Sequence, residues 1–535
     1  MAARPVAAWT HRFDRRWLAP MACLLLLAGL ALAVVFVSTR HGIGLRDDSF
    51  HYFSAAESLV RGAGYGRVGG DGQWIPLTNF PPGYSALLGI LHAGGLELAA
   101  AARLLNGLAL AWLIMIVGLT VAYASRQPWA GVISGGMILM SPSIIEVFSW
   151  AHSEPVYLAL LASGLLLVVA ALRTGRSASG WWLAAGAALT LACLTRYVGI
   201  AACAAGAVAV MVEVRSDRQV PRSLLPLASL VGLPALGLAV LATRNWLVSG
   251  GLVNRPAPYW HPPQGEALAQ GGNTILGWLL PANWLPVAAP AAAGGALLAL
   301  TVFLVPLLIL RAAAHAGPGH DEAGWRTTTV LHASHVVIYA SLLLTSLLLF
   351  DRLTPLDDRI LSPALVSLVI LAGLGIAKLL ETRNRITHVG RSLAVMALIG
   401  LVGYAGWMTL AARARESQGF NSPLWRSSLG MEIIAPLPDR PIYSNNIAAF
   451  YFLTDRRATS IPIRTDPASG QPREDYESSL EAMHTNLRAS GGYLVLLGWP
   501  PEARVEAEHL MDLIGEMTVL ERTRDGLILC YCDRE

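Results

Sequence analysis

Long runs without charged residues divide the first three quarters of the chain. A helix crosses the apolar part of a bilayer with about 20 residues, and these runs reach that length. Beyond residue 412 the apolar runs shorten to strand length and charged residues become frequent. We therefore predict an α-helical polytopic membrane domain over 1–412 and a separate domain over 413–535. The eleven predicted spans are 17–39, 104–125, 127–145, 155–172, 177–195, 197–212, 223–243, 287–310, 328–350, 360–377 and 392–412.

Two further uncharged regions do not read as complete spans. Residues 72–96 are interrupted near their middle by Pro81, Pro82 and Gly83, and proline breaks a helix interior. We expect this segment to be an interfacial helix within the first outer loop, 40–103. The first part of 267–310 is punctuated by Gly, Asn and Pro, so we place it at the outer interface as well.

The C-terminal region alternates short apolar runs with amphipathic segments. This alternation predicts a small α/β domain with a mostly parallel sheet. The predicted strands lie at 440–445, 458–463, 492–499 and 526–532. The predicted helices lie at 446–453, 476–490 and 501–517.

Composition agrees with a membrane protein and excludes other classes. Of the 535 residues, 54% are hydrophobic and 14% are charged, whereas a soluble domain has about 25% charged residues. The net charge of +4 is spread along the chain, so it gives no nucleic-acid-binding surface. The five cysteines form no recurring framework, and we interpret all of them as structural. Cys530 and Cys532 alternate on a predicted strand and therefore point to one face.

Basic residues set the expected orientation. Arg4, Arg12, Arg15 and Arg16 precede the first span, and positive residues hold that end of a span in the cytoplasm. The apolar run that follows is too long for a cleaved signal peptide, so we expect it to be retained. Arginines are also more frequent in the predicted inner loops than in the outer ones. With eleven spans, the first loop and the C-terminal domain both lie outside the cytoplasm.

The first outer loop carries two adjacent acids, Asp47 and Asp48, with His51 and Tyr52 one helical turn further on. One interpretation is a helix cap, because a carboxylate accepts the unpaired amide hydrogens of a first turn. A cap accounts for one aspartate, whereas a second adjacent carboxylate adds repulsion. The other interpretation is a catalytic base at the membrane surface.

Other outer loops bring further polar groups to the same level. His152 and Glu154 stand at the start of a span, where Glu154 also suits a helix N-terminus. Arg196 lies between two spans, as a snorkelling anchor or as a ligand for an anionic headgroup. Arg359 begins another span, where it pairs either with its neighbouring acids or with a phosphate. Together these groups suit the displacement of a lipid-borne phosphate from a sugar carbon.

An ordered series of motifs resembles the GT-C superfamily of polyprenyl-phosphate-sugar-dependent glycosyltransferases. It is most similar to the bacterial members that resemble protein mannosyltransferases and the aminoarabinose lipid A transferase. The resemblance covers roughly residues 15–380, and it depends on the order of the motifs more than on any one of them. The motifs are "RDDSFHYFSAAESLVRGAGY", "NFPPGYSALLGILHAGGLELAAAARLLN", "HSEPVYLALLASGLLLVVAALRTG", "AAGAALTLACLTRYVGIAA" and "LDDRILSPALVSLVIL".

The resemblance implies an inverting glycosyltransferase of the bacterial inner membrane, with its active site outside the cytoplasm. It assigns Asp47 as the catalytic base, with Asp48 as its partner or as a metal ligand. It assigns Arg196 and Arg359 to the donor phosphate. The residues that it places around the substrates are His51, Tyr52, Tyr84, His152 and Glu154.

The implied partners are a polyprenyl-phosphate-linked sugar donor and a glycan, lipid or protein acceptor, with no nucleic acid. Some relatives use a divalent cation, Mg²⁺ or Mn²⁺, whose ligands here would be Asp47, Asp48 and Glu154. The sequence names neither the sugar nor the acceptor. Two alternatives remain, a multi-span transporter and a non-catalytic envelope assembly protein.

Overall fold

The computed structural model describes most of the chain, and its residues form two compact units. It covers residues 15–70, 72–174, 178–215, 224–252, 258–280, 284, 290–315, 323–381, 385–454, 456–466, 469–498 and 515–532. The first unit contains the helical bundle, within Met1–Arg40, Asn79–Tyr84 and Ala100–Arg415. The second contains His41–Thr78, Ser85–Ala99 and Glu416–Glu535. Arg4, Arg12 and nearly all of the predicted helix 501–517 lie outside the described residues.

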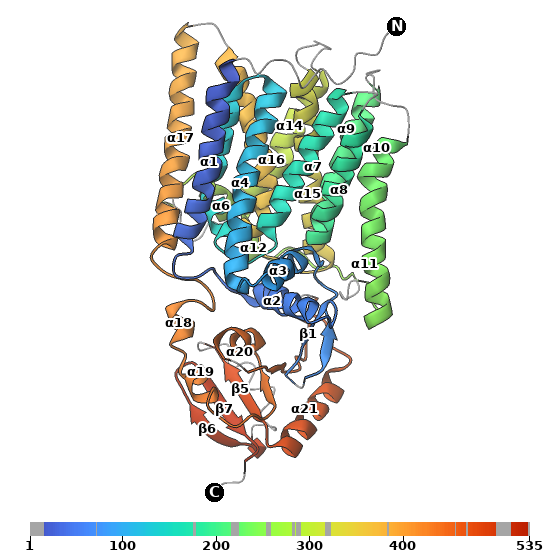
Figure 1. Cartoon of the computed structure of the whole chain (residues 1–535), viewed down its shortest axis with the longest axis vertical. Coiled ribbons are helices and arrows are strands. Elements are labelled where there is room, and N and C mark those ends of the chain that lie inside the picture. The colour runs from blue at the N-terminus through green and yellow to red at the C-terminus, as the bar shows by residue number, and fades with distance from the viewer. Residues whose placement is uncertain are drawn as a thin grey trace. The chain divides into compact units, whose positions relative to one another are not determined.

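The first unit consists of long apolar helices that run side by side (Figure 1). Each of the eleven segments predicted to span the membrane overlaps a helix, although the span predicted at 127–145 is divided into α5 and α6. The helices are α1 (Arg15–Ser38), α4 (Leu98–Ser125), α5 (Pro128–Leu139), α6 (Pro142–Phe148), α7 (Glu154–Thr174), α8 (Ser179–Thr195), α9 (Ile200–Arg215), α10 (Leu225–Leu227), α11 (Leu233–Ser249), α12 (Gly265–Gly277), α13 (Ala291–Ala299), α14 (Val305–His315), α15 (Ala323–Leu349), α16 (Asp358–Glu381) and α17 (Arg385–Arg413).

Length and apolar composition identify nine membrane-spanning candidates among the helices that are described. A tenth would be the pair α5 and α6, which is bent by 57° at the break before Pro142. The predicted span 177–195 corresponds to α8, which is apolar but has only 17 residues. The chain is therefore a multi-pass membrane protein whose first unit has the predicted helical character.

The helices of the bundle differ in how deeply they are buried. In the most apolar stretch of α16, 83% of the residues are buried, and in α7 the share is 72%. The corresponding share is only 22% for both α1 and α17. Since α7 and α16 lie at the centre of the bundle, the residues at their first turns are held by packing on several sides.

Helices α12 and α13 approach each other closely through glycines. A Cβ atom placed on Gly272 would lie 2.3 Å from the Cα of Gly294. Only residues without a side chain permit such an approach of two backbones. The first part of 267–310, which we expected at the interface, is thus a helix packed on its neighbour.

The second unit begins with α2 (Asp47–Val60), a two-stranded hairpin and α3 (Gly83–Ala93). The hairpin pairs β1 (Gly66–Val68) with β2 (Trp74–Pro76) in antiparallel register. The apolar helix predicted within 72–96 starts only after Pro81 and Pro82, and β2 occupies the part before them. The prolines fix extended backbone ahead of the helix.

The C-terminal part of the second unit is an α/β domain around a five-stranded sheet. Its elements are α18 (Pro423–Arg426), α19 (Leu429–Ile434), β3 (Ile442–Ser444), α20 (Ile447–Leu453), β4 (Thr459–Ser460), α21 (Tyr476–Ser490), β5 (Tyr493–Leu497), β6 (Thr518–Arg522) and β7 (Gly526–Cys530). The strand order is β4-β3-β5-β7-β6. The central strand β5 is buried along its whole length.

The expectation of a mostly parallel sheet is wrong. Strand β3 pairs in parallel with β4 and with β5, whereas β7 pairs antiparallel with both β5 and β6. Strand β6, which was not predicted, forms a hairpin with β7. A tight hairpin brings the last strand back antiparallel, because no crossover helix separates the two strands.

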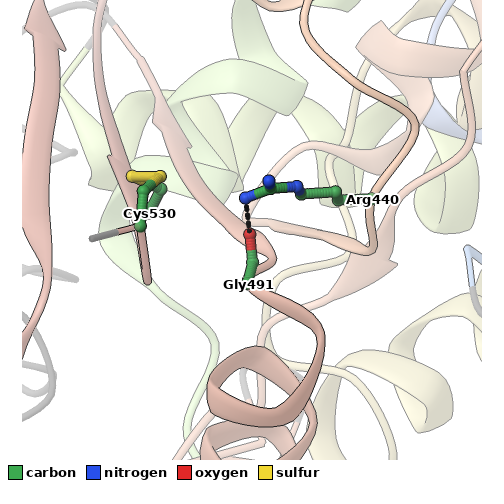
Figure 2. Close-up of a disulfide and its surroundings, with 4 residues drawn as sticks. Arg440, Gly491 and Cys530 are labelled. Atoms are coloured by element: carbon green, nitrogen blue, oxygen red, sulfur yellow. Dashed lines mark hydrogen bonds between the residues drawn. A yellow bond between two sulfur atoms is a disulfide. The ribbon is translucent and has the colours of Figure 1, made fainter. Parts of the chain in front are cut away.

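A disulfide joins Cys530, at the end of β7, to Cys532. Figure 2 shows this disulfide together with Arg440, which donates a hydrogen bond to the carbonyl oxygen of Gly491 at 3.0 Å. Gly491 ends α21 with φ +60°, a left-handed conformation that favours glycine.

Candidate functional site

The candidate residues fall into two groups, one in each unit. Glu154, Arg196 and Arg359 come together in the helical unit, with Tyr84 and His152 in the same unit. The other candidates, Asp47, Asp48, His51 and Tyr52, lie on α2 in the second unit. Each group is built by short segments at helix ends.

A buried carboxylate at the start of α7 binds two arginines. Glu154 is only 1% exposed, and its Oε1 atom lies 2.5 Å from Nη1 of Arg196. The same oxygen lies 3.4 Å from Nε of Arg359. Ser153 donates a longer hydrogen bond, 3.5 Å, to Oε2 of Glu154. Two guanidinium groups therefore meet one carboxylate, and these three side chains carry one excess positive charge.

Local structure explains how these three side chains reach one point. Glu154 is the first residue of α7 and is followed by Pro155, a residue that suits a first helical turn. Arg196 follows the last residue of α8 in extended conformation, with φ −148° and ψ 128°. Arg359 is the second residue of α16, and Asp357, which precedes this helix, accepts a hydrogen bond from the Ile360 amide at 3.0 Å. Each arginine thus lies where a helix meets a loop.

The contacts of Glu154, Arg196 and Arg359 bear on the other roles that each residue could have. Glu154 does open a helix, yet it also holds two arginines. Arg196 is paired with a buried acid, so it is more than an anchor at the membrane surface. Arg359 contacts Glu154, whereas its neighbour Asp358 accepts a hydrogen bond from Ser143. Adjacent residues on a helix point in different directions, so Arg359 and Asp358 make different contacts.

Tyr84 and His152 are buried in the same unit. Tyr84 is fully buried, and burial together with the charge of Glu154 raises the pKa of its phenol far above the ordinary value. The phenol therefore stays protonated and is a hydrogen-bond donor. His152 is 1% exposed and stacks on Trp150, with ring centroids 5.8 Å apart and an interplanar angle of 10°.

The aspartate pair occupies the first turn of α2. The N-cap position belongs to Arg46, whose amide donates a hydrogen bond to Oγ of Ser49 at 3.1 Å. Neither aspartate is thus the capping residue, although both benefit from the positive end of the helix dipole. The capping interpretation alone does not explain why two carboxylates are placed here.

The pKa values of Asp47 and His51, near the start of α2, are shifted from their ordinary values. Loss of hydration raises the pKa of Asp47 although part of the residue is exposed; the charge of Asp48 raises it further, and Arg46 lowers it. A carboxylate with a raised pKa is a stronger base. Burial, assisted by Arg67 and opposed by Asp48, lowers the pKa of His51 to about 4. His51 is therefore neutral near pH 7.

Contacts from α20 that sequence reasoning missed hold α2 in the second unit. The hydroxyl of Tyr451 donates a hydrogen bond to Oε1 of Glu57 at 2.8 Å. The rings of Phe50 and Tyr451 pack edge to face with centroids 5.2 Å apart. The aromatic run at 450–452 was predicted as part of a helix, but the pattern gave no signal for its partner.

Sequence reasoning also missed a second charged group in the helical unit. Glu146 on α6 pairs with Arg413 at the end of α17, with Oε2 and Nε 2.5 Å apart. Its other carboxylate oxygen accepts a hydrogen bond from Trp150 at 3.0 Å. The only signal in the sequence was the presence of an acid at the end of an apolar run.

Within the described part of the chain, no three His, Cys, Asp or Glu side chains are arranged to hold a metal ion. Asp47 and Asp48 offer two oxygen ligands of the kind that Mg²⁺ and Mn²⁺ prefer. Glu154, the third expected ligand, pairs with Arg196 and Arg359. We therefore derive no step through a metal.

Comparison with known proteins places this fold. No protein-family model matches the chain, and no curated protein matches its sequence. Solved structures do match. ArnT from Cupriavidus metallidurans bound to undecaprenyl phosphate has a TM-score of 0.58 at 14% identity, over 96% of this chain and 98% of that chain.

Two further structures have the same architecture. The archaeal oligosaccharyltransferase AglB from Archaeoglobus fulgidus, in complex with an inhibitory peptide and a dolichol-phosphate, has a TM-score of 0.53 at 13% identity, over 92% of this chain and 70% of that chain. The arabinofuranosyltransferase AftD from Mycobacteria has a TM-score of 0.53 at 13% identity, over 98% of this chain and 42% of that chain. The chain therefore has the fold of the GT-C glycosyltransferases, as its motifs implied.

Proposed function

We propose that this protein is an inverting glycosyltransferase that moves a sugar from a polyprenyl-phosphate donor to an acceptor outside the cytoplasm. The observation that carries the proposal is the buried Glu154 with Arg196 and Arg359 on either side. Two guanidinium groups on one carboxylate suit a phosphate monoanion or diester, which arginine binds in two-pronged geometry. The fold supports the proposal, because two of the similar structures contain a polyprenyl or dolichol phosphate.

In the proposed reaction, an acceptor hydroxyl attacks the anomeric carbon of the donor sugar. The bond from that carbon to the phosphate oxygen breaks as the new glycosidic bond forms, which inverts the anomeric configuration. The acceptor proton passes to the carboxylate of Asp47 or Asp48. The departing polyprenyl phosphate gains a negative charge, which Arg196 and Arg359 stabilise. His51, Tyr52, Tyr84 and His152 are proposed to position the substrates.

We further propose that the second unit and the active site face the outside of a bacterial inner membrane. The arginines before the first span support a cytoplasmic N-terminus. The disulfide between Cys530 and Cys532 supports an oxidising compartment for the C-terminal domain. A glycan, a lipid or a protein is the acceptor, and its identity follows from the glycans and lipid-linked sugars of a strain that lacks the protein.

Substitution of each aspartate tests the proposed base. In membranes from the complemented strain, transfer of labelled sugar from the lipid donor is measured for Asp47→Asn, Asp48→Asn and Glu477→Gln. The residue that acts as base should lose about 10²- to 10⁴-fold in rate when replaced. Glu477 is exposed on α21 and serves as the matched control.

Asparagine also tolerates the start of a helix, so a structural role alone survives these changes. Full transfer in both asparagine variants would refute the assignment of the base. A protein that moves the lipid-linked sugar across the membrane without breaking it would be the transporter of the alternative hypothesis. If the protein neither moves nor transfers the lipid-linked sugar, the hypothesis of an envelope assembly protein is favoured.

A further inference from the structure

Two free cysteines contact each other beside the loop that carries Arg196. Cys193 lies near the end of α8 and Cys203 lies near the start of α9, and their Sγ atoms are 3.8 Å apart. Cys193 is fully buried, and Cys203 is 6% exposed. The proposed reaction uses neither thiol. A bond between the two sulfur atoms would join the facing ends of two helices.

The two sulfur atoms are close enough to be joined by small movements of the side chains. A disulfide has an S–S distance of about 2.05 Å, so the atoms need to approach by less than about 2 Å. The staggered positions of a sulfur about its Cα–Cβ bond lie about 3 Å apart. Rotation of one or both side chains therefore covers the distance that separates Cys193 from Cys203.

Gly199 brings the two cysteines together from the turn between the helices. A Cβ atom placed on Gly199 would lie 2.9 Å from the amide nitrogen of Cys193 and 3.0 Å from its Sγ atom. A residue with a side chain would not fit this closely, so glycine permits the approach. On the other side, the thiol of Cys203 donates a weak hydrogen bond to the carbonyl oxygen of Gly199 at 3.6 Å. Both thiols thus lie against the same turn.

A buried cysteine often acts as a small apolar residue and no more. Cys23, the third free cysteine, fits that description: it lies on α1, and no contact between thiols involves it among the described residues. Cys193 and Cys203 differ because each has a second thiol as its neighbour. Two thiols in contact can form a bond that neither could form alone.

We propose that Cys193 and Cys203 form a reversible disulfide that closes the loop around Arg196. The S–S bond forms as each thiol loses one hydrogen. The two electrons and two protons pass to dioxygen, which is reduced to hydrogen peroxide. Dioxygen is small and apolar, so burial in an apolar helical bundle does not exclude it. A dithiol reductant returns two electrons and two protons and opens the bond through a mixed disulfide.

The disulfide would act on the segment that positions Arg196. The closed ring contains residues 193–203, so Arg196 lies within it, with its Nη1 atom 2.5 Å from Oε1 of Glu154. Its amide donates to the carbonyl oxygen of Ala192 at 2.8 Å, and the Gly199 amide donates to its carbonyl oxygen at 2.9 Å. A cross-link over this turn restricts its opening. This effect is independent of whether the chain transfers a sugar.

Peptide mass spectrometry of the full-length protein in lipid nanodiscs tests for the bond. One sample is oxidised in air with copper–phenanthroline and another is reduced with dithiothreitol; both are then denatured, alkylated and digested with trypsin. Trypsin cleaves after Arg196, so the two cysteines fall in separate peptides, 177–196 and 197–215. We expect the oxidised sample to contain these peptides joined, with two hydrogens fewer than their sum. In the reduced sample they should be separate, and each should be alkylated.

Three variants show which thiols are joined. Cys193→Ala and Cys203→Ala should each abolish the joined species, whereas Cys23→Ala should retain it. In the wild type, oxidation should protect two of the three free thiols from alkylation. If either of the first two variants fails to fold, the joined peptides of the wild type and of Cys23→Ala decide.

Hydrogen exchange measures the effect on the loop. Peptides that contain the amides of Arg196 and Gly199 should exchange more slowly in the oxidised wild type than in the reduced one. Oxidant should not change their exchange in Cys203→Ala. The proposal is overturned if peptides 177–196 and 197–215 stay separate after oxidation, or if species joined through Cys23 are equally abundant. Equal exchange in the two redox states would overturn the closure of the loop around Arg196.

Discussion

Two regions of the helical unit combine carboxylates and arginines in opposite proportions. Around Glu154, two arginines meet one buried carboxylate, so positive charge is in excess. A cavity of about 510 Å³ is lined by α6, α12, the first turn of α16 and the end of α17. There Glu146, Glu266 and Asp358 meet the single guanidinium of Arg413, so negative charge is in excess. The division falls between two consecutive residues, Asp358 and Arg359. The start of α16 thus contributes one residue to a region with excess positive charge and the residue before it to a region with excess negative charge.

The difference in charge separates the ligands that the two regions favour. An excess of positive charge favours an anion, whereas an excess of negative charge disfavours one. Both regions lie at the first turn of α16, which is one of the most buried helices in the bundle. A rigid helix start holds the two regions at a fixed separation.

The largest effect on stability is expected from Glu154→Gln. This change leaves two arginines beside a neutral, 1% exposed side chain, and loss of one partner of a buried pair costs about 3 kcal/mol. Chemical denaturation of the purified protein in lipid measures the difference. Glu266→Gln, in the exposed part of the cavity wall, should change the free energy of unfolding by less than about 0.5 kcal/mol. Equal effects of the two changes would remove the contrast between the regions.

A smaller effect is expected on the pH dependence of transfer. If Asp47 is the base, transfer is lost as pH falls through its pKa, which lies above the ordinary value because of burial and the charge of Asp48. Asp48→Asn removes the repulsion, so the acid limb of the rate profile should move to lower pH, by about one unit or less. A limb that stays in place, or moves upward, would contradict the role of Asp48. Complete loss of transfer in Asp48→Asn would instead identify Asp48 as the base.

Effects on stability smaller than that of Glu154→Gln are expected from two serines, one in each region. Ser143 donates to the carboxylate of Asp358, and Ser153 donates to Glu154 over a longer distance of 3.5 Å. Ser143→Ala should cost about 1–2 kcal/mol of stability, as for a hydrogen bond to a charged acceptor. Ser153→Ala should cost less, because the hydrogen bond that Ser153 donates to Glu154 and the one it accepts from Arg196, at 3.3 Å, are both long. The reverse order, measured by the same denaturation, would show that the two contacts are wrongly ranked.

The sequence predicted the helices of this protein better than it predicted the contacts between them. Hydrophobic periodicity and span length located the helical segments, and the amphipathic run 476–490 has the bounds of α21. Strand β6 was missed because 518–522 is short and carries two charged residues. The pattern along one strand also does not show whether its neighbour runs parallel to it.

The candidate sites show the same limit. Glu154, Arg196 and Arg359 were predicted from their positions at helix ends and from the resemblance. The short outer loops contain few polar residues at the membrane surface, so few candidates had to be considered. The cavity was missed because Glu146, Asp358 and Arg413 are far apart in sequence. Which face of α6, α12 or α17 points inward depends on packing between helices, which no single segment encodes.

Binding of undecaprenyl phosphate to variants of the Glu154 cluster tests the central claim most directly. Binding to the purified protein in nanodiscs is compared for wild type, Arg359→Gln, Glu154→Gln and Arg413→Gln. We predict at least about ten-fold weaker binding for Arg359→Gln and tighter binding for Glu154→Gln, because Glu154 competes with phosphate for the arginines. Arg413→Gln should bind like the wild type. Unchanged binding in Arg359→Gln, or a loss in Arg413→Gln alone, would contradict the assignment of the phosphate to this cluster.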